Sequence, residues 1–150
     1  MSRTTSEPAN ESKRPAELTD KIGYLLKHAQ LRFQEIQRDA LTPLSLDGRL
    51  LAVLITAEHA GPSQQLRLAE KLEVDRTTMV DLVDRLEASG FVERRHDPDD
   101  RRARLIDLTP RGRKALTAGI AASDEVEAQF LAALSAAEQR TFRQALSSLL

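Results

Sequence analysis

The sequence predicts a mainly α-helical fold that contains one small β-hairpin. Apolar residues recur at intervals of three and four over most of the chain, which is the period of an amphipathic helix. Only residues 91–95 and 104–108 depart from this period, and their pattern is typical of two short strands separated by a polar loop. Prolines and glycines divide the 150 residues into segments of helical length.

The composition is that of a small protein with an aliphatic core. Hydrophobic residues make up 41% of the chain and aromatic residues only 3%, and the formal net charge is −1. The chain has no cysteine, which excludes disulfides, cysteine-ligated metal sites and thiol redox switches. No apolar run is long enough to span a membrane and no signal-peptide pattern opens the chain, so we expect a cytoplasmic protein.

The first part of the chain predicts a tail and two helices. Residues 1–16 are mostly polar, a composition typical of a flexible tail. Residues 17–39 carry a narrow apolar stripe at spacings of three and four, which predicts an amphipathic helix. Residues 47–60 are apolar nearly all round, so we expect a buried helix there, with Asp47 as its N-cap.

Two short helices are predicted next, in close succession. Ser63 is a candidate N-cap for the first of them, which we expect to end near Leu72. The residues of this helix that we expect to face the core are Leu66 and Ala69.

The second short helix is predicted over residues 76–89, between a candidate N-cap, Asp75, and a terminating glycine, Gly90. Its predicted inward face has the spacing i, i+3, i+4, i+7 and consists of Met79, Leu82, Val83 and Leu86. Only three residues separate the two helices, which is the arrangement of a helix-turn-helix.

The predicted β-hairpin follows this helix-turn-helix directly. Its strands are residues 91–95 and 104–108, and its loop is the polar, proline-containing segment 96–103. A helix-turn-helix followed at once by a two-stranded hairpin is a winged helix-turn-helix, which we assign to residues 46–109.

The C-terminal part predicts two further helices. Thr109 and Pro110 form a strong helix start, an N-cap followed by proline at the first helical position, and the helix can continue to about Leu134. Ser135 and Glu138 then have the spacing of a capping box that opens a last helix.

The helices at the two ends of the chain carry more apolar surface than one small winged domain can cover. We therefore predict that residues 17–45 and 110–150 are dimerisation helices, which pair with those of a second copy in a two-fold homodimer. The alternative is a monomer in which these helices pack on each other.

The predicted helix 76–89 has the features of a recognition helix, whose N-terminal residues contact base edges in the major groove. Arginine pairs with guanine, threonine with several bases, and aspartate accepts from cytosine. Asp84 lies farther along and would repel phosphate, so we expect it to pair with a neighbouring arginine. The alternative is an ordinary solvated helix face. The candidate DNA contacts on and around this helix are Ser63, Gln64, Arg76, Thr77, Thr78, Asp81 and Arg85.

The hairpin loop is rich in arginine, and such side chains suit a narrow minor groove. We expect Arg101, Arg102 and Arg104 to contact DNA and Asp100 to fix the loop through an arginine. Several aspartates in the same loop leave a self-neutralised surface hairpin as the alternative. Because acidic and basic residues nearly balance over 61–114, we expect only a modest dependence of binding on salt.

The stretch from Gln64 to Leu108 resembles the core of the MarR family of bacterial transcriptional regulators. The motifs LAEKL, DRTTM, LVDRLE, GFVERR, DPDDRRA and then LTPRG occur in the order and spacing of that family. The resemblance implies a homodimeric winged helix that binds a pseudo-palindromic operator. It also implies a repressor that is usually released by a small, often phenolic or anionic, ligand.

Carried over by position, the recognition helix of the family corresponds to Arg76–Ser89 of this chain. The wing signature of the family corresponds to Asp100, Arg101, Arg102 and Ala103, and it implies that Asp100 braces the wing and Arg102 enters the minor groove. The peroxide-sensing branch of the family uses a cysteine, and this chain departs from it because it has none.

An effector pocket in this family usually lies between the dimerisation helices and the winged domain. Polar and aromatic residues near that junction are candidates for ligand binding, and His28 among them could hydrogen-bond an anion and respond to pH. Ordinary packing or surface positions are the alternative for each. The candidates are Tyr24, His28, Arg32, Phe33 and His59.

No pattern in the sequence predicts an enzyme. The three histidines lie far apart without metal-ligand spacing, and the glycines form no phosphate-binding loop. We therefore expect neither a catalytic residue nor a metal or other cofactor. The stronger alternative to DNA binding is a winged-helix module that binds protein partners, because the winged region is nearly neutral in charge.

Overall fold

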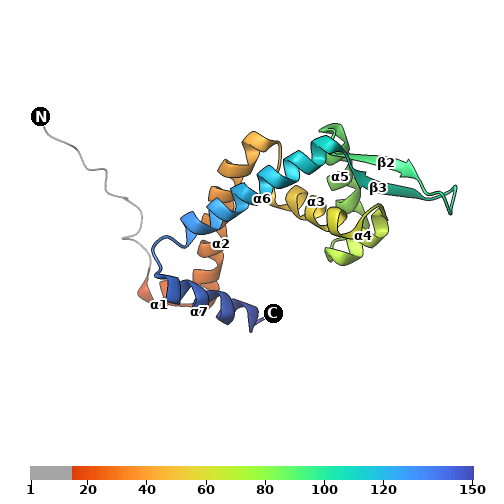
Figure 1. Cartoon of the computed structure of the whole chain (residues 1–150). Coiled ribbons are helices and arrows are strands. Elements are labelled where there is room, and N and C mark those ends of the chain that lie inside the picture. The colour runs from red at the N-terminus through yellow and green to blue at the C-terminus, as the bar shows by residue number, and fades with distance from the viewer. Residues whose placement is uncertain (1–14) are drawn as a thin grey trace, which may run out of the picture.

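Helices occupy most of the chain, and the computed structural model describes residues 15–150 (Figure 1). The first fourteen residues of the predicted tail lie outside the described residues, and Ala16, its last residue, already begins a helix. In chain order the helices are α1 (Ala16–Thr19), α2 (Ile22–Leu41), the 3-10 turn η1 (Thr42–Leu44), α3 (Gly48–Ala60), α4 (Gln65–Lys71), α5 (Arg76–Ala88), α6 (Pro110–Phe130) and α7 (Ala136–Ser147).

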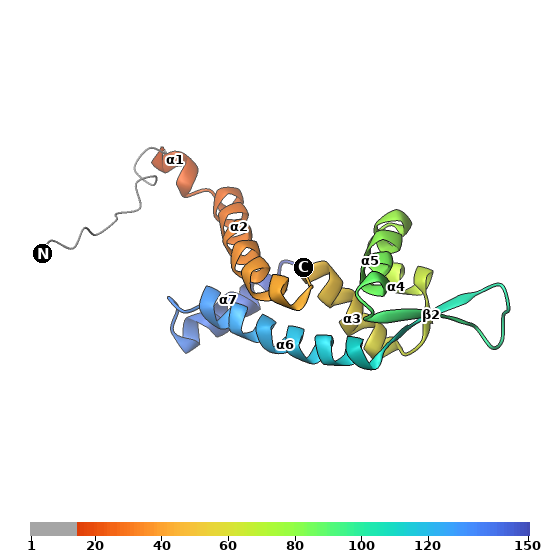
Figure 2. The same cartoon turned by 90° about the horizontal axis from the view of Figure 1, so that it is seen from above.

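The predicted hairpin is present, within a sheet of three antiparallel strands. Strand β2 (Val92–His96) pairs with β3 (Arg104–Leu108), and Val92 lies opposite Leu108. A two-residue strand that the sequence did not predict, β1 (Ser63–Gln64), pairs with the other edge of β3. The hairpin loop extends well beyond the rest of the molecule (Figures 1 and 2).

Local capping signals place most helix starts where the sequence predicts them. The side chain of Asp47 accepts from the Leu50 N–H, and that of Thr109 accepts from the Gly112 N–H. Ser135 forms the predicted capping box with Glu138. These caps satisfy backbone donors that have no partner within the helix, and each prediction is confirmed.

The core lies in the winged domain, between α3, α4, α5, the sheet and the first turns of α6. All four residues predicted for the inward face of the second short helix are buried there, and so is most of α3. The core is aliphatic apart from Phe91, as the low aromatic content predicts. Its residues include Leu50, Val53, Leu54, Leu68, Met79, Leu82, Val83, Leu86, Ile106 and Leu108.

Two predicted helices differ in extent from those observed. The helix predicted over 17–39 is interrupted, because the extended backbone of Lys21 separates α1 from α2, which continues to Leu41. The helix predicted to reach Leu134 ends at Phe130. The side-chain amide of Gln139 on α7 donates to the carbonyl oxygens of Leu131 and Leu134. These bonds satisfy backbone acceptors in the turn that follows α6.

The prediction that Ser63 caps a helix is also wrong. Ser63 pairs with Ile106 in the sheet, and its hydroxyl donates to the carbonyl oxygen of Gly61. The helix therefore begins only at Gln65, with no side-chain cap. With this start Leu68 and Ala69 are the buried positions, and Leu66, which was predicted to face the core, is exposed.

Helix α6 packs closely at two glycines, against backbone at Gly112 and against leucine side chains at Gly119. A Cβ atom on Gly112 would collide with the carbonyl oxygen of Phe91, where α6 crosses the start of the hairpin. A Cβ atom on Gly119 would lie 2.7 Å from Leu51 Cδ1. By contrast, a Cβ atom on Gly23 in α2 would meet nothing within 4 Å.

Helix α6 connects the two ends of the molecule. Its first turns pack on α3 and β3, and its later turns lie along α2, so the winged domain is at one end and α1, α2 and α7 are at the other (Figures 1 and 2). Within residues 15–150 no single helix meets the length and hydropathy expected of a membrane span, although the bent pair 22–44 and 48–60 would meet them together.

Candidate nucleic-acid interface

The N-terminus of α5 is fixed by its cap. The carboxylate of Asp75 accepts from the Thr78 N–H at 2.8 Å and from the Thr78 hydroxyl at 2.6 Å. These bonds, the hydroxyl first, lower the pKa of Asp75 because they stabilise the charged form. Thr78 is thus engaged in the cap, whereas Arg76, Thr77 and Asp81 are exposed on the outer side of the helix.

Arg85, another predicted DNA contact, is held by the cap of α3. Its Nη2 lies 2.7 Å from Asp47 Oδ2. Partial burial raises the pKa of Asp47, but the hydrogen bond from Leu50 and the guanidinium of Arg85 outweigh it, so the pKa is lowered. Arg85 therefore fixes α5 against α3 while half of its side chain stays exposed.

Arg94 on β2 joins the wing to the recognition helix. Its guanidinium lies 2.5 Å from Asp84 and is also bonded to Glu87, both on α5. Its side chain is only 24% exposed. Burial lowers the pKa of Arg94, but the two carboxylates outweigh it and raise the pKa. The prediction that Asp84 pairs with an arginine is confirmed, and the single charge of Arg94 is shared by two carboxylates on the outer part of α5.

The wing loop is held by its own backbone and leaves its arginine side chains exposed. Asp100 Oδ1 accepts from the backbone N–H of Arg102 at 2.9 Å, and the Asp100 carbonyl accepts from Ala103 at 3.0 Å. Asp100 thus holds the loop through the backbone of an arginine and not through its guanidinium. In the part of the chain that the structure describes, Arg101, Arg102 and Arg104 are exposed and form no ion pair.

The two remaining predicted contacts lie on β1. Ser63 is 93% buried, whereas Gln64 is exposed at the edge of α4. The fold also brings basic residues to this region that the sequence analysis missed. Arg49 on α3 lines a depression with Thr78, Asp81 and Arg85, and Arg67 on α4 lines one with Gln64 and the loop residue Asp99. No sequence motif identifies Arg49 or Arg67 as a candidate, because only tertiary packing brings them close to α5 and the wing loop.

A chain of charged groups connects the wing to α3 and α6. Asp107 on β3 is nearly buried, with 11% of its side chain exposed. Its carboxylate lies 3.2 Å from Arg95 on β2 and 3.6 Å from Arg113 on α6. Arg113 also lies 3.4 Å from Glu58 on α3 and donates to the Leu108 carbonyl oxygen at 2.8 Å. Four elements are thus joined at the base of the wing.

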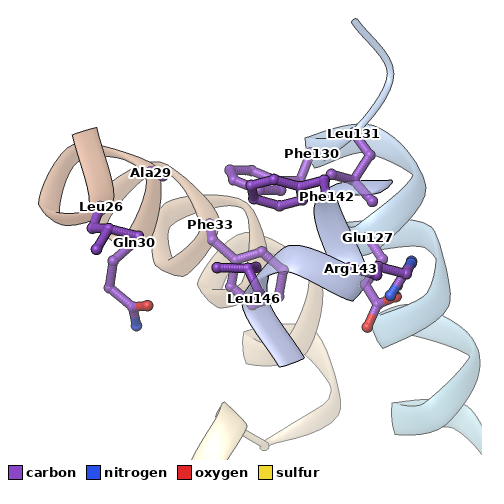
Figure 3. Close-up of a pocket in the computed structure, with 10 residues that line it drawn as sticks. All are labelled: Leu26, Ala29, Gln30, Phe33, Glu127, Phe130, Leu131, Phe142, Arg143 and Leu146. Atoms are coloured by element: carbon purple, nitrogen blue, oxygen red, sulfur yellow. Dashed lines mark hydrogen bonds and ion pairs between the residues drawn. The ribbon is translucent and has the colours of Figure 1, made fainter. Parts of the chain in front are cut away.

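The far end of the molecule has an apolar cavity of about 250 Å³, open on one side, between α2, α6 and α7 (Figure 3). Three of the four phenylalanines of the chain, Phe33, Phe130 and Phe142, line it. The rings of Phe33 and Phe130 pack edge to face at 5.3 Å. At the rim, Arg143 Nη2 lies 2.7 Å from Glu127.

Of the five predicted ligand-binding residues, only Phe33 lines this cavity. Tyr24 and His28 stack on each other along α2, with ring centroids 4.1 Å apart. Arg32 pairs with Glu35 on the surface of α2, and His59 Nδ1 lies 2.9 Å from the Ile55 carbonyl oxygen on α3. The five residues do not form one site within the described chain. No group of three His, Cys, Asp or Glu side chains in residues 15–150 could hold a metal ion.

Sequence comparison identifies relatives of this chain among transcriptional regulators. The model of the MarR family matches residues 49–103. The chain is 30% identical over 138 residues to the HTH-type transcriptional repressor NicR of Pseudomonas putida, and the alignment covers 91% of this chain and 87% of NicR.

Solved structures with this fold include a probable transcriptional regulator from Pseudomonas aeruginosa, with a TM-score of 0.81 and 35% identity over 89% of this chain and 99% of that one. The transcriptional repressor CouR, bound to a 23-mer DNA duplex, has a TM-score of 0.80 and 28% identity over 91% and 96% of the two chains. CouR from Rhodococcus jostii bound to p-coumaroyl-CoA has a TM-score of 0.73 and 30% identity over 90% and 95%.

Proposed function

Because this chain belongs to the MarR family of DNA-binding transcriptional regulators, we propose that it is a homodimeric repressor that binds a pseudo-palindromic operator and is released by a small phenolic or anionic ligand. In each subunit α5 enters the major groove and the loop between β2 and β3 reaches the adjacent minor groove. Family members of this kind generally act by binding and not by catalysis. A role on chromosomal DNA also implies the cytoplasm as the location that we propose.

The observation that carries the DNA-binding proposal is the distribution of paired and unpaired charge. Asp84 and Glu87 share the single positive charge of Arg94, and Asp107 is paired with Arg95 and Arg113. The exposed guanidinium groups of the wing loop are left to attract phosphate and the negative minor groove. Asp97, Asp99 and Asp100 equal these arginines in number, but the carboxylates of Asp97 and Asp100 accept from backbone N–H groups of the loop, so the guanidinium groups stay free to contact DNA.

The homodimer proposal rests on the apolar surface at the far end of the molecule. Within the described residues α7 buries none of its side chains, although Phe142 and Leu146 lie on one side of it. Leu25 and Leu26 on α2 are also about half exposed. A second copy would cover these residues, and a two-fold axis would place two α5 helices one helical turn of DNA apart.

The effector proposal draws on CouR, whose bound p-coumaroyl-CoA combines a phenol with anionic groups. On this chain we propose a ligand site along α2, in which Tyr24, His28 and Arg32 supply polar contacts and Phe33 packs against the ring; His59 on α3 does not line the cavity with Phe33. We expect p-coumaroyl-CoA or p-coumarate to release the repressor from DNA. His28→Ala should weaken this response about tenfold without changing the affinity for DNA in the absence of ligand.

The first experiment is a fluorescence-anisotropy titration with a duplex from upstream of the protein's own coding region and random duplex as competitor. We expect specific binding by the wild type and a loss of about 10- to 100-fold for Arg102→Ala, since a dimer loses two groove contacts. Lys27→Ala removes a charge from α2, far from the wing, and should bind as the wild type does.

If the folded dimer binds no such duplex, a selection from a random-sequence library decides between two explanations. Recovery of a specific sequence shows that the operator lies elsewhere. Failure to recover one would overturn the DNA-binding proposal for this chain and favour a winged-helix module that binds protein partners.

A further inference from the structure

Two large apolar side chains are exposed beside each other on the helix-turn-helix. Leu66 on α4 is 41% exposed and Val80 on α5 is 40% exposed. Both line one shallow depression between the two helices, together with Gln65, Ala69, Arg76 and Met79. Most other large apolar side chains of the winged domain are buried, so this pair, the Leu66–Val80 patch, stands out within the described residues.

Val80 lies on the side of α5 that holds the candidate base contacts. It follows Arg76 by four residues and Thr77 by three, so the three side chains are neighbours on the helix surface. Met79, directly before Val80, and Val83, three residues after it, are buried in the core. Val80 is therefore within reach of whatever α5 contacts in the major groove.

The charges around the patch also favour duplex DNA as its occupant. Asp84 and Glu87, one and two turns beyond Val80, share the positive charge of Arg94, whereas the exposed Asp81 forms no ion pair within residues 15–150. Arg76 lies at the rim of the depression and forms no ion pair within residues 15–150. The patch thus combines an apolar centre with a cation at its edge, and Arg94 offsets part of the acidic charge farther along the helix.

We propose that the Leu66–Val80 patch binds the 5-methyl group of a thymine in each operator half-site, and that Val80 is a residue that determines sequence specificity. The inference rests on the DNA-binding function proposed above and names one base that this function reads. The thymine methyl is the one apolar group that base pairs present in the major groove. Covering it with the patch removes apolar surface of both partners from water.

The size of the effect follows from the burial of one methyl group. Removing such a group from an apolar contact lowers affinity by about four-fold. The two half-sites of a palindrome double the effect in free energy, which gives about 15-fold for a symmetric change in both half-sites.

The experiment replaces thymine by uracil, which removes only the methyl group. An operator is first obtained by selection from a random-sequence library, and each symmetric thymine pair is then replaced by deoxyuridine. We expect one pair to lower wild-type affinity by about 15-fold and the others to have little effect. Val80→Ala should weaken binding to the unmodified operator by a similar factor and be insensitive to uracil at that pair.

Two further variants test whether the uracil effect depends on the Leu66–Val80 patch or follows from the loss of any exposed apolar side chain. Leu66→Ala should also reduce the uracil effect, because it removes the other wall of the depression. Ile120→Ala truncates a comparably exposed side chain on α6 and should keep the full uracil effect. Circular dichroism and sedimentation verify that each variant is a folded dimer.

The outcomes distinguish this inference from the function on which it rests. A wild-type protein that selects no duplex contradicts the proposed function itself. A wild-type protein that binds a selected operator equally well with uracil at every thymine overturns only the inference, as does a Val80→Ala variant with an unchanged uracil effect. The uracil series with the wild-type protein gives an answer even if a variant fails to fold.

Discussion

Arg94 is the residue on which the electrostatics of the recognition helix depend. Its guanidinium holds both Asp84 and Glu87 and is mostly buried against α5. Without it, two carboxylates would face the phosphates of a bound duplex, and the wing would lose its contact with α5. We therefore expect Arg94 to influence DNA binding through α5, by pairing with Asp84 and Glu87.

We expect Arg94→Ala to lower DNA affinity about tenfold at low salt, because Asp84 and Glu87 lose the positive charge that they share. The difference should shrink as salt rises, since the Debye length falls from about 10 Å at 0.1 M to about 3 Å at 1 M. Anisotropy titrations over a series of salt concentrations measure it. The double variant Arg94→Ala/Asp84→Asn should recover part of the loss, and wild-type affinity in Arg94→Ala alone would contradict this role.

Replacing glycine by alanine should have opposite effects on stability at Gly112 and at Gly23. At Gly112 a methyl group would collide with the Phe91 carbonyl oxygen, so Gly112→Ala should destabilise the protein by about 2–4 kcal/mol. At Gly23 the space is open, and Gly23→Ala should stabilise it by up to about 1 kcal/mol, since alanine favours the helix. Urea unfolding of the two variants tests this, and two shifts of the same sign would refute the packing argument.

At the scale of helices, the caps were the most predictable features of the fold. Asp47, Asp75, Thr109 and Ser135 were all predicted correctly, because a cap depends on a side chain and a backbone group three residues away. Ser63 has the same chemistry, yet it joins a strand. Its partner, Ile106, is distant in sequence, so no local signal could reveal the pairing.

The caps also predict how stability depends on pH. Hydrogen bonds from Thr78 lower the pKa of Asp75 below its ordinary value of 3.8. A lowered folded-state pKa adds stability that is present above the unfolded value and is lost as pH falls through the folded value. We therefore expect the free energy of unfolding to fall below about pH 4.

Asp75→Asn tests this assignment, because asparagine caps helices well without a titrating group. Its free energy of unfolding should fall less steeply than that of the wild type between about pH 4 and pH 2.5. Asp20→Asn, at an exposed position outside the helices, is the control and should follow the wild type. Parallel curves for all three proteins would show that the Asp75 cap does not contribute to the pH dependence.

The ion pairs at the base of the wing add electrostatic links between the sheet, α3 and α6, which also pack on one another. Asp107 is nearly buried between Arg95 and Arg113, so its removal leaves two cations without their shared partner. We expect Asp107→Asn to lower the free energy of unfolding by about 1–3 kcal/mol. Urea unfolding measures this, with Asp99→Asn in the exposed wing loop as the control; equal midpoints for the two variants would argue against a structural role.

At the scale of the whole molecule, the sequence predicted the two-ended architecture but not all of its contacts. The spacing of apolar residues and the positions of prolines and glycines were enough to predict the helix-turn-helix, the hairpin and the presence of long helices on both sides of them. Arg49 and Arg67 were missed as neighbours of the DNA-facing helices, because they approach them only through tertiary packing. The phenylalanine-lined cavity likewise combines residues from α2, α6 and α7, and only Phe33 of these was a candidate.

The exposed apolar face of α7 predicts that dimerisation and DNA binding are lost together. Phe142→Asp places a charge in the apolar cavity, and we expect it to yield monomers in sedimentation velocity and to weaken DNA binding by at least 100-fold. Gln144→Asp changes an exposed position on the same helix and should remain dimeric. A dimeric Phe142→Asp variant would show that subunits associate through another surface.

Helix α6 has a mechanical consequence that follows from its length. Its 21 residues span about 32 Å between the apolar cavity and the base of the wing. A tilt of about 5° at the cavity end would displace the wing end by about 3 Å. In a two-fold pair the two displacements are opposite, so the recognition helices would shift by about 6 Å against a half-site spacing of about 34 Å. Because α6 is long, a small tilt of α6 at the cavity end would thus move the two α5 helices of a dimer out of register with the operator.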